Sequence, residues 1–182
     1  MDLTSAPDTP PAEPVNLLFL HRSIGGHLLA EPGPEEPSGR VHPNGGGLRK
    51  ALETNNYRVH EATYGSKLGQ DTDMFHWLPK FRDHMAEVLR IQHQDQALPA
   101  GEVNRVVLFK SCFPNNYFSE GSGPGDPNGP TLTVPNARAT LRALLPLFQR
   151  QPDTLFVYLT SPPIVGIAEQ EPLYKWGLKT LL

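Results

Sequence analysis

Short apolar runs alternate with longer segments in which apolar residues recur at helical spacing, and this alternation sets the predicted fold. Four runs have the length and composition of buried strands: residues 15–20, 58–62, 105–109 and 155–159. Helical spacing appears over residues 73–92, where Pro79 marks either a kink or a later start, and over residues 134–149. Strands separated by helices predict an α/β fold with a doubly wound parallel sheet, the first strand at its centre.

Polar and Pro-rich stretches frame this pattern. Residues 1–14 are rich in Pro and acidic side chains and predict a disordered tail. Residues 31–47 hold four Pro and five Gly and predict a long surface loop. The rest, residues 15–182, is expected to form one domain. A last helix should begin near Pro172, and it reaches Leu182 without a capping signal, so the domain is expected to lack its C-terminal part.

Composition and charge narrow the possible classes of protein. A chain of 182 residues suits one domain with a real core. Its net charge of −3 provides no basic field for nucleic acid or for an anionic membrane. No apolar run is long enough to span a bilayer, and no secretory signal is visible, so a cytoplasmic location is expected. Cys112 is the single cysteine, so we predict no intrachain disulfide, no metal site and no cofactor.

The turn after the first strand carries the most chemical information. The strand ends abruptly at residues 21–26, His-Arg-Ser-Ile-Gly-Gly, and Leu28 and Leu29 suit the helix that follows. In a parallel sheet, ligands and reacting groups gather at the carboxyl ends of the strands. Ser23 is expected near the N–H groups that begin this helix, where a developing oxyanion finds donors. The simpler interpretation is that Ser23 is only an N-cap.

The same turn resembles the first block of a divergent branch of the SGNH (GDSL-type) hydrolases, in which a His-containing sequence replaces the usual Gly-Asp before the serine. Residues 107–114, Val-Leu-Phe-Lys-Ser-Cys-Phe-Pro, are similar to the third block of that branch. The resemblance covers most of the ordered chain. It implies a flavodoxin-like, three-layer α/β/α fold and hydrolysis of a carbohydrate or small-alcohol ester.

The resemblance also implies roles for individual residues. Ser23 falls on the nucleophile, with its own N–H serving the oxyanion. Gly69, with Gly65 as the alternative, falls on the glycine of the second block. Asn115 or Asn116 falls near the asparagine of the third block, although the usual Gly-x-Asn-Asp is absent. Donors from three loops that meet at one point stabilise an oxyanion, so these residues are expected to converge.

The general base implied by the resemblance does not appear in the sequence. The family places it in Asp-x-x-His after a fifth strand, and no His follows His93. A serine without a base is a poor nucleophile, so we expect a nearly inactive chain that self-associates through an unfinished sheet edge. His21 is either a surrogate base, without an evident orienting carboxylate, or a structural or substrate-contacting residue. Arg22 is either a surface charge or the binder of an anionic substrate group.

Two other hypotheses remain open. One is a non-catalytic version of the same fold, and the other is a flavodoxin-like binding module that takes an anionic ligand at the Ser23 turn. Cys112 is predicted to be a buried, inert thiol. Several histidines are predicted to lie on the surface or on a helix face: His42, His60, His76, His84 and His93.

Overall fold

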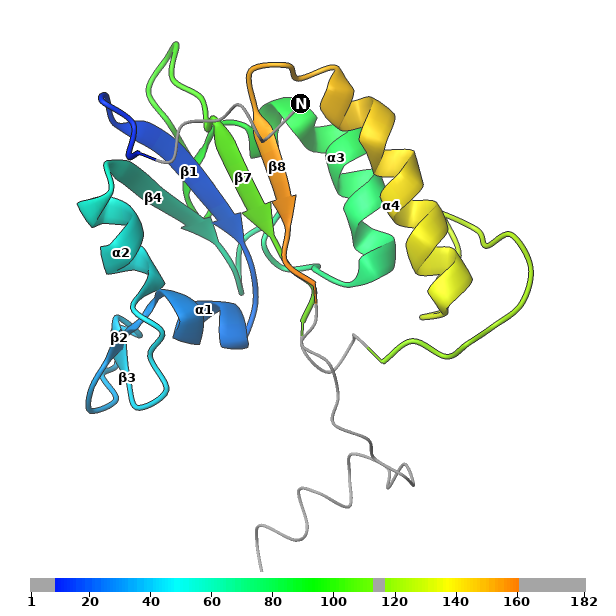
Figure 1. The fold of residues 1–182 in the computed structure, drawn as a ribbon, viewed down its shortest axis with the longest axis horizontal. Coiled ribbons are helices and arrows are strands. Elements are labelled where there is room, and N and C mark those ends of the chain that lie inside the picture. The colour runs from blue at the N-terminus through cyan, green and yellow to red at the C-terminus, as the bar shows by residue number, and fades with distance from the viewer. Residues whose placement is uncertain (1–8, 113–116, 161–182) are drawn as a thin grey trace, which may run out of the picture.

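A computed structural model describes residues 9–112 and 117–160 (Figure 1). Its main sheet has six strands. The strand order is β6-β5-β4-β1-β7-β8. All neighbouring strands are parallel except β5 and β6, which form an antiparallel pair at one edge. The strands are β1 (Val15–Leu20), β4 (Tyr57–Ala62), β5 (Ile91–His93), β6 (Gln96–Ala97), β7 (Val106–Phe109) and β8 (Leu155–Tyr158).

The four strands expected from the apolar runs are confirmed, and so is the central place of the first. β1 lies between β4 and β7, with Leu17 opposite Val59 on one side and Val106 on the other. Residues 17–20 of β1 are each at most 4% exposed, as a strand covered on both faces requires. The α/β class with a mostly parallel sheet is therefore confirmed.

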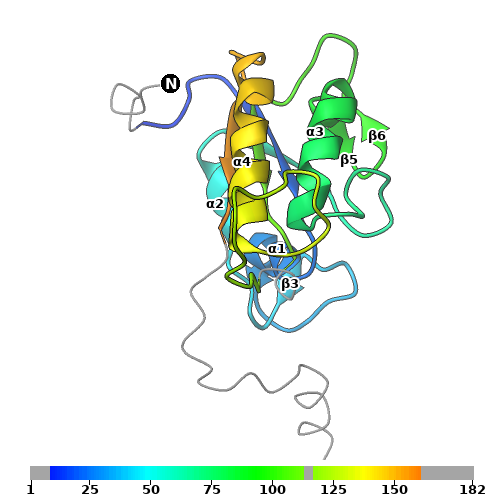
Figure 2. The ribbon, with the colours of Figure 1, turned by 90° about the vertical axis from the view of Figure 1, so that its right-hand side faces the viewer.

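Helices lie against both faces of the sheet (Figures 1 and 2). Leu18 and Leu20 of β1 point into the main core, which also contains buried residues of α3 and α4. Phe19 points the other way and packs with Leu29 of α1 and Leu108 of β7. This arrangement is compatible with a three-layer α/β/α fold. The helices are α1 (Ile24–Leu29), α2 (Leu48–Thr54), α3 (Met74–Val88) and α4 (Val134–Gln149).

An aromatic cluster fills the space between the sheet and the helices α3 and α4. The ring of Phe81 is its hub and is 1% exposed. Ring centroids lie 5.0 to 6.0 Å from that of Phe81, and three of the four contacts are edge-to-face, a favoured geometry. The four partners are Trp77, Phe109, Phe148 and Phe156.

Two segments differ from the sequence-based expectation. The helix predicted over residues 73–92 ends at Val88, and its non-helical residue is His84 rather than Pro79. The chain then forms the β5–β6 hairpin. The loop predicted over residues 31–47 contains a small parallel ladder of β2 (Glu31–Pro32) and β3 (Val41–His42). Strands of two or three residues are too short to leave a periodic pattern, which is why the sequence did not reveal them.

The chain before β1 is described from residue 9. The side-chain amide of Asn56 donates to the carbonyls of Pro11 and Ala12, at 2.8 and 3.0 Å, which fastens this part of the predicted tail to the start of β4. The helix predicted near Pro172 lies outside the described residues. None of the helices in the described ranges is long and apolar enough to cross a membrane.

Candidate functional site

Ser23 occupies a strained turn at the carboxyl end of β1. Its φ of 49° makes it one of three non-glycine residues with a positive φ in the described ranges. Ser23 is an N-cap by position, but its side chain makes no capping hydrogen bond to α1, and Gly26 N–H binds its carbonyl oxygen instead. The exposed hydroxyl finds no partner among the described residues. The N-cap interpretation thus leaves the hydroxyl unexplained.

The Ser23 turn borders a cleft of about 730 Å³ at the ends of β1, β4 and β5. This volume suits a small ligand. Most of the lining side chains carry hydrogen-bonding groups. The lining comes from the end of β1, from α1 and α2, from the segment between β2 and β3, and from β4 and β5 with their flanking residues. The lining side chains include His21, Arg49, Glu61, Tyr64 and His93.

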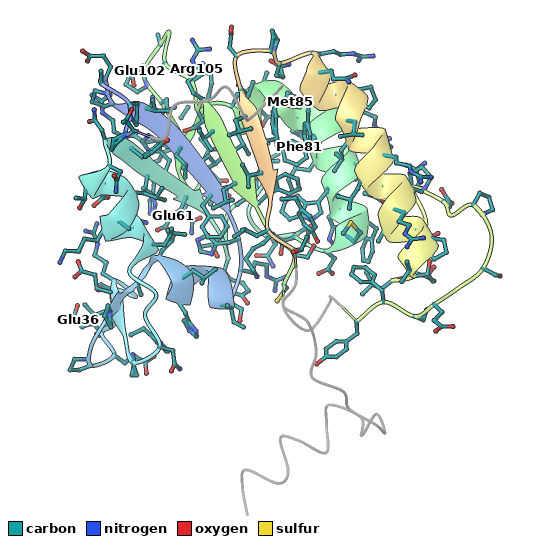
Figure 3. All side chains as sticks on the ribbon, in the orientation of Figure 1. Glu36, Glu61, Phe81, Met85, Glu102 and Arg105 are labelled. Atoms are coloured by element: carbon teal, nitrogen blue, oxygen red, sulfur yellow. The ribbon has the colours of Figure 1, made fainter. Side chains whose placement is uncertain are left out.

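Glu61, labelled in Figure 3, is the carboxylate around which an arginine and two histidines of this cleft gather. Its Oε2 lies 3.0 Å from Arg49 Nη2 and 3.5 Å from His21 Nε2, and its Oε1 lies 3.9 Å from His93 Nδ1. The hydrogen bond from His21, with help from the Arg49 cation, holds the pKa of Glu61 below its usual value although burial opposes this. Glu61 was not among the site residues predicted from the sequence. It lies opposite Phe19 in the pairing of β1 and β4, and therefore on the same face of the sheet as His21.

His21 does have an orienting carboxylate, contrary to the sequence-based expectation, but it does not contact Ser23. Its side chain is 3% exposed and donates to Glu61 Oε2 through Nε2. The other ring nitrogen, Nδ1, is buried and has no hydrogen-bond partner among the described residues. A Cβ on Gly25 would come within 2.7 Å of that nitrogen. This geometry favours the structural role, in which His21 joins β1, β4 and α1.

Arg22 is partly buried rather than a simple surface charge. Its guanidinium carbon lies 4.5 Å from the centroid of the Tyr64 ring, a cation–π contact. The Nε atom of Arg22 is buried and has no hydrogen-bond partner in the described part of the chain. Arg22 does not line the Ser23 cleft itself, and reaches it only through its contact with Tyr64, which does.

The two candidate oxyanion glycines lie on the loop after β4, and their N–H groups are already engaged. Gly69 N–H donates to Ser66 Oγ at 3.1 Å, and Gly65 N–H donates to Gln70 Oε1 at 3.0 Å. Gly69 also fits tightly, because a Cβ there would lie 2.3 Å from Thr63 N. In this structure both donors serve the loop itself, so their oxyanion role stays a prediction that needs the loop to rearrange.

The side chain of Lys80, on α3, binds the loop that follows β4. Its buried ammonium donates to the carbonyl oxygens of Leu68 and Asp71 and lies 4.8 Å from the centroid of the Trp77 ring. Burial lowers the pKa of Lys80 to about 8. Nothing in the sequence marks this lysine, because a polar residue in an amphipathic helix is normally assigned to the solvent face.

The third predicted donor, Asn115 or Asn116, lies outside the described residues. The residues just before it form a well-connected turn. Lys110 Nζ donates to the carbonyl oxygen of Ser111 at 2.7 Å, and Trp77 Nε1 donates to Ser111 Oγ at 3.0 Å. Cys112 is buried with a free thiol, as predicted.

Two histidines that do not contact Glu61, His60 and His42, are less exposed to solvent than predicted. His60 is half-buried, with Nε2 3.3 Å from Asn16 Oδ1, and desolvation lowers its pKa. His42 stacks on His27, with ring centroids 3.8 Å apart. No group of three or more His, Cys, Asp or Glu side chains in residues 9–112 and 117–160 is placed to hold a metal ion.

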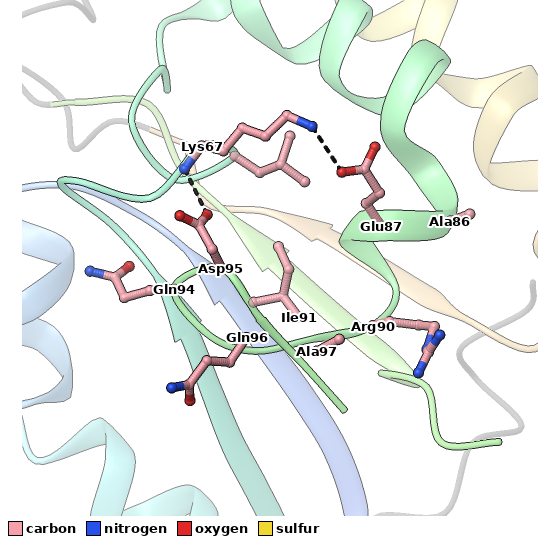
Figure 4. A pocket seen from close by; sticks show the side chains of 10 residues that line it. Lys67, Ala86, Glu87, Arg90, Ile91, Gln94, Asp95, Gln96 and Ala97 are labelled. Carbon is pink, nitrogen blue, oxygen red and sulfur yellow. Dashed lines mark hydrogen bonds and ion pairs between the residues drawn. The ribbon is translucent and has the colours of Figure 1, made fainter. Parts of the chain in front are cut away.

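A second pocket, of about 550 Å³, lies between the end of α3 and the β5–β6 hairpin (Figure 4). Its charged groups satisfy one another. Lys67 Nζ pairs with Glu87 at 3.1 Å, and Lys67 N–H donates to Asp95 at 2.8 Å. Its lining contains no serine, cysteine or histidine, so the Ser23 cleft is the stronger candidate for chemistry.

Comparisons with protein-family models, with curated proteins and with solved structures each found no match. The candidate site therefore rests on its geometry alone. Ser23, His21 and Arg22 lie together at one end of β1, next to Glu61 of β4 and Tyr64 of the loop that follows. The N–H groups of the two glycines donate within their own loop.

Proposed function

We propose that this chain is a serine ester hydrolase of the SGNH type, with Ser23 as the nucleophile and a carbohydrate or small-alcohol ester as the substrate. The observation that carries the proposal is the state of Ser23: a positive φ, an exposed hydroxyl without a described partner, and a place on the wall of a 730 Å³ cleft. Backbone strain of this kind clusters at functional sites, and a strained turn after a strand suits a nucleophile.

The proposed reaction begins when Ser23 Oγ attacks the ester carbonyl carbon. A bond forms between Oγ and that carbon, negative charge develops on the carbonyl oxygen, and backbone donors at the turn stabilise it. The Oγ proton passes to solvent water, the ester C–O bond breaks, and the alcohol leaves with a proton taken from water. A second water then hydrolyses the acyl-serine and returns the proton to Oγ. Because no imidazole in the described part of the chain hydrogen-bonds to Ser23, the hydroxyl lacks a general base and we expect slow turnover.

The test compares hydrolysis of p-nitrophenyl acetate by the chain, by Ser23→Ala and by Ser38→Ala. Ser38 lines the same cleft, and its hydroxyl donates to Glu36 at 3.3 Å, so it is a matched control. We expect a low rate that Ser23→Ala abolishes and Ser38→Ala retains. Mass spectrometry after treatment with diisopropyl fluorophosphate should place the adduct on Ser23. Equal rates for the chain and Ser23→Ala would contradict the proposal.

A second candidate function is a flavodoxin-like binding module for an anionic ligand. The buried, unpartnered Nε of Arg22 beside the Ser23 turn favours it. Calorimetric titration with inorganic phosphate and with a flavin mononucleotide distinguishes the two. The binding module would be supported if phosphate or the flavin binds saturably, if Arg22→Gln weakens that binding, and if Ser23→Ala leaves the rate of ester hydrolysis unchanged.

A further inference from the structure

Two exposed, large apolar side chains flank Ser23. Within the described ranges three such side chains occur: Ile24, Tyr64 and Leu145. Ile24 follows Ser23 directly, and Tyr64 lines the Ser23 cleft with 48% of its surface exposed. Leu145 lies on α4, away from the cleft. Tyr64 therefore offers an exposed aromatic ring to a ligand in the cleft, and aromatic side chains are common in ligand sites.

The ring of Tyr64 is held in place before any ligand arrives. The Arg22 guanidinium covers one face at 4.5 Å. The backbone around it is fixed by Gln94, whose Nε2 donates to Tyr64 O at 3.0 Å and whose Oε1 accepts from Thr63 N at 2.9 Å. A ligand that stacks on the ring therefore meets a preorganised surface, and little conformational entropy is lost on binding.

The cleft also contains several polar side chains beside the apolar Leu29 and Val59. Glu61 and His21 lie in it, and Arg40, Gln92 and His93 also contribute to the lining. A long acyl chain seated here would remove these groups from water without giving them hydrogen-bond partners, which is costly. A sugar ring fits better, because it offers a face of C–H groups to an aromatic ring and a rim of hydroxyls to polar side chains.

We propose that Tyr64, backed by Arg22, is a stacking platform for a pyranose ring, and that the substrate of Ser23 is a sugar ester. The ester chemistry rests on the proposed function. The binding of the ring itself rests only on Tyr64 and the polar cleft, so the two can fail separately.

The test uses the Ser23→Ala chain, in which ligand is bound and not consumed, and methyl 6-O-acetyl-glucopyranoside as the probe. Calorimetry should show saturable binding. Adding Tyr64→Ala should weaken it roughly threefold to tenfold, the range for one well-placed aromatic contact. Tyr64→Phe, which keeps the ring, should stay within about twofold. Leu145→Ala removes an equally exposed apolar side chain from α4 and should change nothing.

Several outcomes would overturn the platform. One is unchanged binding in Tyr64→Ala, and another is no saturable binding of the glycoside while p-nitrophenyl hexanoate binds well. If thermal unfolding shows that Tyr64→Ala is not folded, a perturbed Tyr64 ring resonance on adding the glycoside replaces it as the readout, and an unperturbed one overturns the platform. Glycoside binding without Ser23-dependent hydrolysis would support the platform and contradict only the proposed function.

Discussion

The two faces of the sheet are built from different chemistry. On the side of α3 and α4, most of the buried side chains are apolar, with Lys80 as an exception, and aromatic rings interlock around Phe81. On the side of α1 and α2, the buried apolar cluster is small and consists of Phe19, Leu29 and Leu108. Beside it lie buried His21 and half-buried Glu61, on the wall of the cleft.

This contrast separates the part of the fold that supplies most of the apolar core from the part that holds the candidate site. Burial of apolar and aromatic area on one face supplies most of the favourable free energy of folding. The other face carries polar groups that hold one another in place and leave Ser23 strained. A single strand, β1, joins the two because its alternate side chains face opposite layers. Substitutions on the two faces should therefore have distinct effects.

The largest effect is expected on the aromatic face. Phe81→Ala removes the hub of the cluster and should lower the free energy of unfolding by about 3–5 kcal/mol. Phe75→Ala, on the same helix but half-exposed, is the control and should cost clearly less. Urea denaturation measures both. Equal losses for the two variants would show that the cluster does not dominate stability.

A smaller and pH-dependent effect is expected at Glu61. Glu61→Gln should lower the free energy of unfolding by about 1.5–3 kcal/mol at pH 7, because it weakens hydrogen bonds to a charged group. Its folded pKa lies below the usual value of 4.5, so the ionised form is favoured by folding. The difference between the chain and the variant should be complete above pH 4.5 and shrink as pH falls through the folded pKa.

Exposed Glu31, which pairs with Lys50 at 3.1 Å, provides the control for Glu61. Glu31→Gln should change the free energy of unfolding by less than about 1 kcal/mol at any pH. Denaturation curves recorded between pH 3 and pH 7 compare the two variants. A Glu61→Gln difference that is independent of pH would contradict the charge network.

The smallest effect separates two adjacent glycines of α1. A Cβ on Gly25 would lie 2.3 Å from His21 Cβ, so Gly25→Ala should cost about 1–3 kcal/mol through overpacking. A Cβ on Gly26 would meet nothing closer than 3.8 Å, so Gly26→Ala should be neutral or slightly stabilising. Thermal unfolding of the pair is a direct comparison. Equal stability of the two variants would show that α1 does not press on His21.

β1, β7 and β8 were predictable because burial demands short, nearly continuous apolar runs, and β4 was predictable from the alternation of its apolar and polar residues. β2, β3, β5 and β6 were not predictable, since their few residues carry no period and depend on neighbours for pairing. α3 ended earlier than its apolar spacing suggested, because Leu89 and Ile91 continue the spacing beyond the helix.

At the site, local turn chemistry placed Ser23 correctly after β1, and tertiary pairing supplied what the sequence did not show. Glu61 and His21 are 40 positions apart and meet only through the register of β1 and β4. Gly69 was placed on the correct loop, but the direction of its N–H depends on Ser66. The oxyanion role of Asn115 or Asn116 stays a prediction.

Because β1 is the central strand, the order of synthesis and the order of assembly conflict. β1 leaves the ribosome first, but Leu17 must wait for Val59 and then for Val106 before both its edges are paired. Such distant pairings carry a loop-closure penalty and slow the folding of a chain. Until β7 is made, β1 remains an open template for other chains, and we expect it to be the segment that molecular chaperones shield.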